Sequence, residues 1–218
     1  MAKFETEFED LPEALGVFPL SGLLLLPRCV ISLNLFEARY LALFEWAICN
    51  HRLMAIGQPK QPVGNDPDPA LYDTITAARI VGFEETPEQH ILVHLKGICR
   101  GKIGDELPLQ DGFRRFKIDW SDFADDLTST GRPFLERDDF FAMLRRFFTN
   151  HKIETDWDAL QAAPDERLVA MLAMTIDFGP VEKQALLEAD DWPKRAAILS
   201  ALMEMSINHD QDGKNFMQ

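Results

Sequence analysis

Several pairs of adjacent carboxylates have side chains that suit acid–base chemistry, among them Glu84-Glu85, Asp138-Asp139 and Asp190-Asp191. Catalysis by two carboxylates needs both groups at one site with separated pKa values. Neighbouring residues of a strand point to opposite sides, so Glu84 and Glu85 are poor partners. The two aspartate pairs precede or open predicted helices, where acids interact favourably with the helix dipole. We therefore predict no catalytic carboxylate pair.

His90 and His94 have a spacing that would suit a metal site on a helix. The surrounding apolar alternation of Ile91, Val93 and Leu95 instead indicates a strand, on which the two imidazoles would lie roughly 13 Å apart. No third ligand of a suitable type is close in the sequence. We predict no metal site and interpret the histidines as polar residues on a solvated strand face.

Nucleophiles and phosphate-binding loops offer no stronger signal. The three cysteines, Cys29, Cys49 and Cys99, form no C-x-x-C pair, and their apolar surroundings predict buried, reduced thiols in a cytoplasmic protein. No serine lies in a nucleophile elbow. Gly101-Lys102 lacks the glycine spacing and the following Ser or Thr of a P-loop. We predict neither a cofactor nor an enzymatic activity.

The composition narrows the range of partners. The chain of 218 residues is 46% hydrophobic and has a net charge of −14. Nucleic-acid binding is disfavoured because it depends on neutralising phosphates. Residues 16–36 hold one charge, Arg28, and are long enough to cross a bilayer, but Pro19, Pro27 and Asn34 oppose a spanning helix. The acidic segment before them opposes a secretory signal.

Residues 16–40 organise the predicted first half. Apolar runs at 17–20 and 29–33 predict two strands joined by a tight connection, and the simplest interpretation of them is a buried hairpin. A helical stripe follows, made by Tyr40, Leu41, Phe44, Ala47 and Ile48. Asn34 and Glu37 have the spacing of a capping box for that helix.

Further strands are predicted at 52–56, 74–83, 90–103 and 113–120, with a breaker-rich loop at 57–70. Gly97, Gly101 and Gly104 indicate bulges or bends of the kind that a closing barrel needs. Five or six strands with one intercalated helix favour a small closed or half-closed barrel.

A helical period begins after the polar segment at 122–132. Phe140, Leu144, Phe147 and Phe148 form one stripe. Further helices are predicted after a Thr155–Asp158 capping box and from Pro164, the latter carrying Leu168, Met171 and Leu172. Two more are predicted from Gly179-Pro180 and from Asp191, the last with Ile198, Leu202 and Met205 on one face. The methionines and phenylalanines fit a core, although methionine-rich surfaces also accept varied partners. We predict an α+β protein with units at 15–123 and 133–207.

The same residues carry a resemblance to a known family. Phe18, Pro19, Leu20, Gly22, 24–27, 33–37, Arg39 and Tyr40 resemble the opening signature of the Lon protease N-terminal substrate-binding domain. Residues 157–160, 163–169, 180–189 and 195–205 resemble the helical part of stand-alone members. The family often has Pro, Gly and Ser where Ala38, Ile75 and Gly179 stand. The resemblance implies a β-rich PUA-like pseudobarrel followed by a C-terminal helical bundle.

The resemblance also implies a function. It predicts a non-enzymatic module that binds unfolded, partly folded or degron-bearing polypeptides, with a protease system as a further partner. The ATPase and serine–lysine protease parts of Lon find no counterpart in these 218 residues. An RNA-binding PUA-like module is the alternative, against which the charge weighs. A small-molecule enzyme is the third hypothesis and would need a pocket with converging titratable groups.

Two groups of residues receive specific roles. Leu23, Leu24, Leu25 and Leu26 exceed what a short connection needs, so we expect at least one or two of them to be exposed or to be covered by the helical half. If exposed, they would border a groove that accepts an extended apolar segment. A structural role is predicted for Phe18, Pro19, Leu20, Gly22, Pro27, Asn34, Phe36, Glu37, Arg39 and Tyr40. Arg39 and Glu37 are expected to tie the first helix to the barrel.

Overall fold

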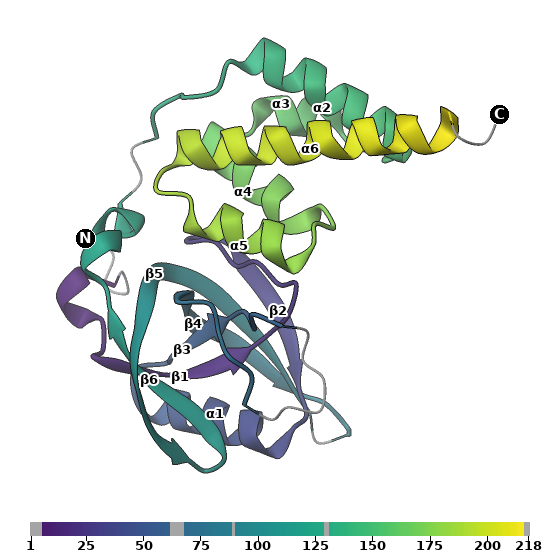
Figure 1. The fold of residues 1–218 in the computed structure, drawn as a ribbon. Coiled ribbons are helices and arrows are strands. Elements are labelled where there is room, and N and C mark those ends of the chain that lie inside the picture. Colours follow the sequence, from purple (N-terminus) through teal and green to yellow (C-terminus); the bar gives the residue numbers. More distant parts are fainter. Residues whose placement is uncertain (1–5, 62–67, 89, 129–130, 216–218) are drawn as a thin grey trace. The chain divides into compact units, whose positions relative to one another are not determined.

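The computed structural model describes residues 6–61, 68–88, 90–128 and 131–215, and in the last helix the side chains as far as 208. The chain divides into two compact units, 1–129 and 130–218, shown in Figure 1. The first is built around a sheet and the second is helical, which confirms the α+β class. Among the described residues, no helix has the length and apolar character to cross a membrane.

The first unit is a closed barrel. Its strands are β1 (Ala14–Pro19), β2 (Val30–Leu35), β3 (Leu53–Gly57), β4 (Thr74–Glu85), β5 (Ile91–Gln110) and β6 (Phe113–Asp119). They are ordered β2-β5-β4-β3-β1-β6, and an additional pairing between β5 and β6 closes the sheet. β1 and β3 pair in parallel, and the other pairs are antiparallel. Short 3-10 helices, η1 (Phe8–Asp10) and η2 (Ser121–Leu127), flank the strands.

Helix α1 (Ala38–Cys49) links β2 to β3 and packs against β1, β3 and β6 (Figure 1). It buries Tyr40, Leu43, Phe44 and Ala47, so Leu43 takes the place predicted for Leu41 and Ile48, which are only partly buried. The first helical residue is Ala38.

Two predictions for this region are wrong. β1 and β2 do not form a hairpin, because β1 pairs with β3 and β6 while β2 pairs with β5, and residues 20–29 separate them. The capping box is also absent: Asn34 lies within β2, and the helix N-cap is Glu37, which makes no side-chain capping bond. Pairing with β5 holds Asn34 in an extended strand conformation, so Asn34 does not cap the helix.

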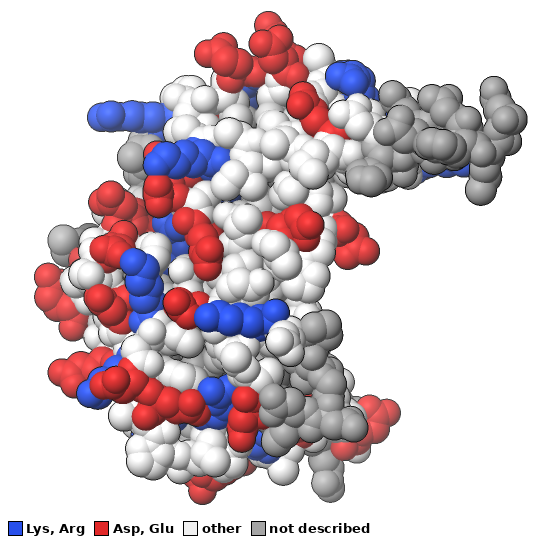
Figure 2. Space-filling view, viewed as in Figure 1, with Lys and Arg blue, Asp and Glu red and all other residues white. Residues whose placement is uncertain are grey.

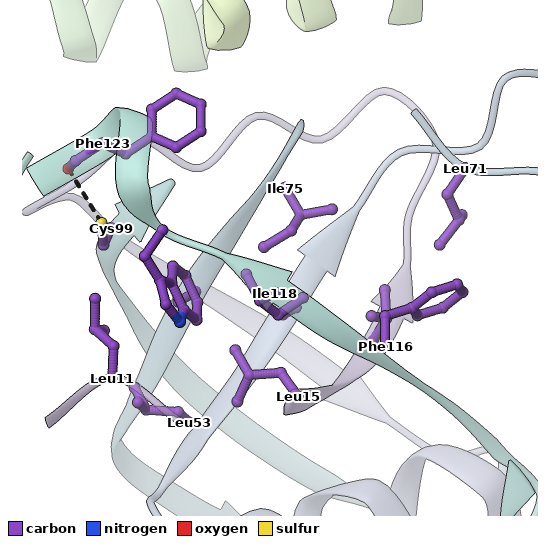
Figure 3. Packing of buried hydrophobic residues seen from close by; sticks show 13 residues of the cluster. Leu11, Leu15, Leu53, Leu71, Ile75, Cys99, Phe116, Ile118 and Phe123 are labelled. Carbon is purple, nitrogen blue, oxygen red and sulfur yellow. Dashed lines mark hydrogen bonds between the residues drawn. The ribbon is translucent and has the colours of Figure 1, made fainter. Parts of the chain in front are cut away.

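One cluster of the barrel core contains side chains from β1, β3, β4, β5 and β6, as well as Leu11, Leu71, Trp120 and Phe123 (Figure 3). Cys99 lies within it and its thiol donates to the carbonyl of Phe123, with sulfur and oxygen 3.3 Å apart. Burial, followed by the nearby Asp126 carboxylate, raises the pKa of Cys99 to about 12. The prediction of a buried thiol is correct for Cys99 only, since Cys29 is partly exposed and Cys49 is exposed.

Bulges let the long β5 pair with three strands. Its first part pairs with β2 and β4, and its last part pairs with β6. The register shifts between Ala77 and Ala78, opposite Gly97, and again between Ile103 and Glu106, which include Gly104. A Cβ atom on Gly101 would lie 2.5 Å from Ile118 and 2.8 Å from Trp120, so glycine is required for close packing there. The predicted bends are confirmed.

The second unit contains α2 (Arg137–His151), α3 (Trp157–Ala162), α4 (Asp165–Thr175), α5 (Pro180–Glu188) and α6 (Trp192–Asn215). Helix α6 packs against α2, α4 and α5. The α2 stripe is buried as predicted, and Gly179 with Pro180 opens α5. The cap of α3 is Asp156 rather than Thr155, because its carboxylate accepts from the N–H groups of Asp158 and Ala159.

The buried face of α6 differs from the prediction. Ala196, Leu199, Met203 and Ile207 are buried, whereas Met205 is 60% exposed. The adjacent Arg195 is only 2% exposed. It donates to the carbonyls of Leu186 and Ala189 at 2.8 and 3.1 Å, which places its positive charge at the carbonyl end of α5. A buried cation therefore contributes to the interior of the helical bundle.

Asp165 connects the segment before α2 to the start of α4. Its carboxylate accepts from the N–H groups of Phe134 and Leu135, at 2.8 and 3.0 Å, and from Arg137. Burial acts to raise its pKa, but these backbone bonds and the arginine outweigh burial and lower it. Asp165 is therefore an ionised group of the helical unit's interior.

Candidate functional site

The leucine segment between β1 and β2 lies against the barrel. Leu24, Leu25 and Leu26 are 3%, 2% and 0% exposed, and Leu23 is half-buried. The Thr76 hydroxyl donates to the carbonyl of Leu25 at 2.8 Å. A Cβ atom on Gly97 would lie 2.3 Å from the carbonyl oxygen of Leu26, so the segment approaches β5 as closely as glycine permits.

This burial corrects the expected exposure of the leucines. The segment is not a strand with alternate faces, and the side chains of Leu24, Leu25 and Leu26 are inaccessible to a ligand in this conformation. Of the four, only Leu23 keeps an exposed portion. The role of Leu23 in binding stays a prediction. The segment as a whole exposes much less apolar surface than its four leucines would suggest.

Part of the signature around this segment packs into the barrel. Phe18 of β1 contacts Tyr40 of α1, with ring centroids 4.2 Å apart. Burial raises the pKa of Tyr40. Gly22 has a positive φ of 72° and donates to the Gln58 side chain at 3.1 Å. Phe36, in contrast, is 60% exposed.

Arg39 and Glu37 pair with each other at the start of α1. Arg39 donates to the Glu37 carboxylate at 2.8 and 3.0 Å, and its guanidinium lies 4.7 Å from the Tyr40 ring centre. The two side chains are 29% and 45% exposed, so the pair is not fully buried. A role of the pair in tying the helix to the barrel stays a prediction.

The carboxylate pairs and the histidines lie at separate places in the structure. Glu84 and Glu85 are exposed at the end of β4, and Asp138 and Asp139 lie in the first turn of α2. Asp191 accepts from the N–H of Lys194 and caps α6. His94 shares a hydrogen bond of 2.8 Å with Ser32. Within the described ranges, no group of three or more His, Cys, Asp or Glu side chains is arranged to hold a metal ion.

A concave apolar site lies in the helical unit. The cavity has a volume of about 630 Å³ and is formed by the end of α2, the link to α3, and parts of α3, α4 and α6. Its lining residues are Phe147, Phe148, His151, 153–156, Ala159, Leu160, Met171, Leu172, 175–178 and Ser206.

The turn after α2 presents part of this lining. Lys152 adopts a left-handed conformation with φ of 55°, and the next N–H, of Ile153, returns to the carbonyl of Phe148 at 2.9 Å. This turn leaves Ile153 42% exposed at the cavity, and Met171 of α4 is 40% exposed there. An accessible isoleucine and methionine beside buried aromatic rings can hold apolar side chains of a ligand.

Three polar groups of the cavity take part in contacts of the fold. The Ser206 hydroxyl and the His151 Nε2 atom lie 3.0 Å apart and connect α6 to α2. Asp156 caps α3 through two backbone N–H bonds. The apolar lining beside them supports binding of apolar groups.

This cavity is only partly predictable from the sequence. The methionines and phenylalanines of the helical half predict either a core or an adaptable surface, and the structure contains both. Met143 and Met203 are buried, whereas Met171 and Met205 are 40% and 60% exposed. Met171, predicted on a buried face of α4, is therefore at the surface, and Ile153 gave no periodic signal because it lies outside the helices.

Comparison with known proteins gives a consistent picture along nearly the whole chain. The family model described as the ATP-dependent protease La (LON) substrate-binding domain matches residues 14–205. The Lon protease 2 of Myxococcus xanthus is 24% identical over 205 residues, which are 89% of this chain and 24% of that protein. The chain thus spans about a quarter of the length of the curated relative that it matches.

Two solved structures share the fold. The Lon N-terminal domain protein from Xanthomonas campestris has a TM-score of 0.60 at 20% identity, with 86% of this chain and 97% of that chain covered. The N-terminal domain of the Mycobacterium avium complex Lon protease has a TM-score of 0.63 at 13% identity, with 88% and 98% covered. At these identities the likeness establishes the architecture.

Proposed function

Because this chain belongs to the ATP-dependent protease La (LON) substrate-binding domain family, we propose that it binds unfolded or degron-bearing polypeptides and accepts their apolar side chains in the cavity of the helical unit. The observation that carries the proposal is the half-exposed pair Ile153 and Met171 at the mouth of a cavity lined by phenylalanines.

The physical basis is the difference between folded and unfolded chains. A folded protein buries most of its large apolar side chains, whereas an unfolded chain exposes them, in a sequence context that differs from one polypeptide to the next. A methionine adapts its shape to different partners because its side chain is unbranched and flexible. The cavity of about 630 Å³ has room for a few side chains rather than for a folded domain.

We further propose that a protease acts on the bound polypeptides. The curated relative is a Lon protease, and this chain corresponds to a quarter of its length. Its family match is to the substrate-binding part. The module would then deliver a polypeptide whose cleavage takes place elsewhere.

The proposal is tested by comparing two exposed methionines of the helical unit. Met171 lines the cavity, and Met205 is exposed on α6 outside it. Binding of a fluorescently labelled, permanently unfolded polypeptide is measured by anisotropy. Met171→Ser should weaken binding about fivefold, since burying the exposed part of a methionine contributes ~1 kcal/mol. Met205→Ser is the matched control and should bind as the parent does.

Equal binding by both variants, or no binding by the parent protein, would contradict the proposal. Ile153→Ser provides a second variant at the cavity, with Val181→Ser, 65% exposed on α5, as its control. A separate Leu23→Ser variant tests whether the leucine segment also contacts the polypeptide.

RNA binding remains the weaker alternative. On the face drawn in Figure 2, acidic side chains lie among the basic ones, and no continuous basic groove crosses the described residues on that face. The net charge of −14 acts in the same direction.

A further inference from the structure

A second cavity, confined to the barrel unit, gathers positive charge in an acidic protein. Its volume is also about 630 Å³. Four cations line it: Arg28, Arg52, Arg79 and Lys96. Each comes from a different segment of the chain, so no local sequence pattern predicts the cluster.

Strand pairing places these cations in one row across the barrel wall. Arg79 of β4 lies directly opposite Lys96 of β5. Arg52 directly precedes Leu53, the residue that pairs with Arg79. The main-chain carbonyl of Arg52 accepts from the N–H of Ile80 at 2.9 Å. Arg28 lies two residues before Val30, the partner of Lys96 in β2.

Like charges directly opposite each other destabilise a sheet. Arg79 and Lys96 therefore weaken the barrel unless an anion lies between them. The ion pairs of the described residues include neither of these two side chains nor Arg52. This arrangement is expected of a site whose ligand supplies the missing negative charge.

Two acidic residues also line the cavity, fewer than the four cations. Asp126 forms a pair with the buried Arg100, which donates through its backbone N–H, Nε and Nη2 at 2.9 Å each. Glu7 is exposed at the cavity and adds one negative charge. The cations therefore outnumber the acids at this site.

Arg79 has donor capacity at this site. Arg28 donates to the main-chain carbonyls of Asp126 and Thr128 beside it. Arg79 donates from Nη2 to the Thr6 hydroxyl at 2.7 Å, and its buried Nε atom has no hydrogen-bond partner among the described residues. A buried donor without a partner is costly, and an anion would relieve that cost.

Apolar side chains border the same cations. Ile80, Val81 and Leu127 line the cavity, and Val81 is 52% exposed. An inorganic ion would leave this apolar surface in water. A carboxylate on a larger molecule would satisfy both surfaces, because its oxygens match the fork of an arginine while the attached chain covers the apolar wall.

We propose that this pocket binds a carboxylate group of a polypeptide, either the chain terminus or an acidic side chain, through Arg79 and Lys96 with Arg28 and Arg52 beside them. The inference rests on the proposed function and names a second contact point for the same polypeptides. It concerns the barrel unit, so it can fail while apolar binding to the helical unit stands.

The test uses three N-acetylated peptides of one apolar sequence. One ends in a free carboxylate, one ends in an amide, and one ends in an amide but carries an internal glutamate. Binding to the 218-residue chain is followed by backbone amide chemical shifts, which locate the contact. We expect a carboxylate-bearing peptide to bind at least tenfold more tightly than the neutral amide and to shift Val81 and Gly97. The two charged peptides distinguish chain terminus from side chain.

Lys96→Gln and Lys117→Gln form the matched pair of variants. Each removes one exposed strand lysine of the barrel unit, but Lys117 lies outside the cavity and pairs with Asp105. Lys96→Gln should weaken carboxylate binding severalfold and leave the melting temperature equal or higher, because it removes the repulsion with Arg79. Lys117→Gln should not change carboxylate binding at the pocket. Arg79→Lys should lose less binding than Arg79→Gln, since it keeps the charge.

Equal affinity for the acid and amide peptides, or equal effects of the two lysine variants, would overturn the inference. Apolar binding confined to the helical unit would overturn it and leave the proposed function intact, whereas absence of all peptide binding would overturn both. Displacement of the acid peptide by inorganic phosphate or by a short single-stranded RNA at lower concentration would replace the carboxylate with phosphate chemistry.

Discussion

At the scale of single residues, the charged groups differ in what their removal should cost. Arg39 contacts Glu37 and the Tyr40 ring, and both charged side chains remain in contact with water. Arg39→Ala should therefore reduce the free energy of unfolding by no more than about 1 kcal/mol, as for other exposed pairs. Chemical denaturation provides the measurement. A loss of several kcal/mol would show that Arg39 has a buried role that its exposure does not indicate.

Asp165 should behave differently, because it is buried and bonds to two backbone N–H groups and Arg137. Asp165→Asn should cost about 1–3 kcal/mol, since an amide cannot accept all three bonds as a carboxylate does. Asp139→Asn, an exposed change in the first turn of α2, is the control and should have little effect. Thermal unfolding of both variants and the parent would give the change in stability that each substitution causes.

The same residue sets a pH dependence. The pKa of Asp165 is lowered in the folded chain relative to its usual 3.8, so the unfolded chain takes up the proton first as pH falls. Its contribution is complete above about pH 4 and declines below that value. The stability difference between parent and Asp165→Asn should accordingly shrink between pH 5 and pH 2, and a constant difference across that range would contradict this account.

At the scale of elements, the sequence predicts periodic segments well where only one face is apolar. The α2 stripe and the bends of β5 follow directly from residue spacing. The α6 face did not, because apolar residues at 198, 199, 202, 203, 205 and 207 occupy more than one side of that helix. Only packing against α2, α4 and α5 selects the buried side.

The candidate sites were harder to predict than the elements that form them. The leucine segment has the composition of an exposed patch, but hydrogen bonding to β4 and close packing on β5 bury three of its four leucines. A turn places Ile153 at the apolar cavity, and the register of strand pairing brings the cations of the barrel close together. Neither arrangement leaves a periodic trace in the sequence.

Glycine substitutions in β5 test this close packing. Gly97→Ala would place a Cβ atom 2.3 Å from the Leu26 carbonyl oxygen, so backbone must move, and we expect a loss of ~1–3 kcal/mol. Gly104→Ala in the same strand meets the Lys117 carbonyl oxygen at 3.5 Å, an ordinary contact, and should be nearly neutral. Hydrogen exchange of residues 23–29 would accelerate in Gly97→Ala only. Equal stability of the two variants would show that the leucine segment yields easily.

At the scale of the whole molecule, family, charge and site chemistry agree on binding. The family match extends over both units, from residue 14 to residue 205. The cavity polar groups His151, Ser206 and Asp156 maintain helix contacts, and the thiol of Cys99 is kept protonated at neutral pH by its raised pKa. A binding module needs shape and apolar surface rather than activated nucleophiles, and both units provide concave surfaces of that kind.

We expect the purified 218-residue chain to bind an unfolded polypeptide without hydrolysing ATP or cutting the polypeptide. The sequence contains no G-x-x-x-x-G-K-[ST] motif to hold nucleotide phosphates, and the matching family model describes substrate binding. Phosphate release and peptide fragments are measured with the polypeptide and ATP present, with a complete Lon-type protease as the positive control. ATP-dependent fragments whose yield follows the chain through successive purification steps would contradict this expectation, because contaminating protease would separate from it.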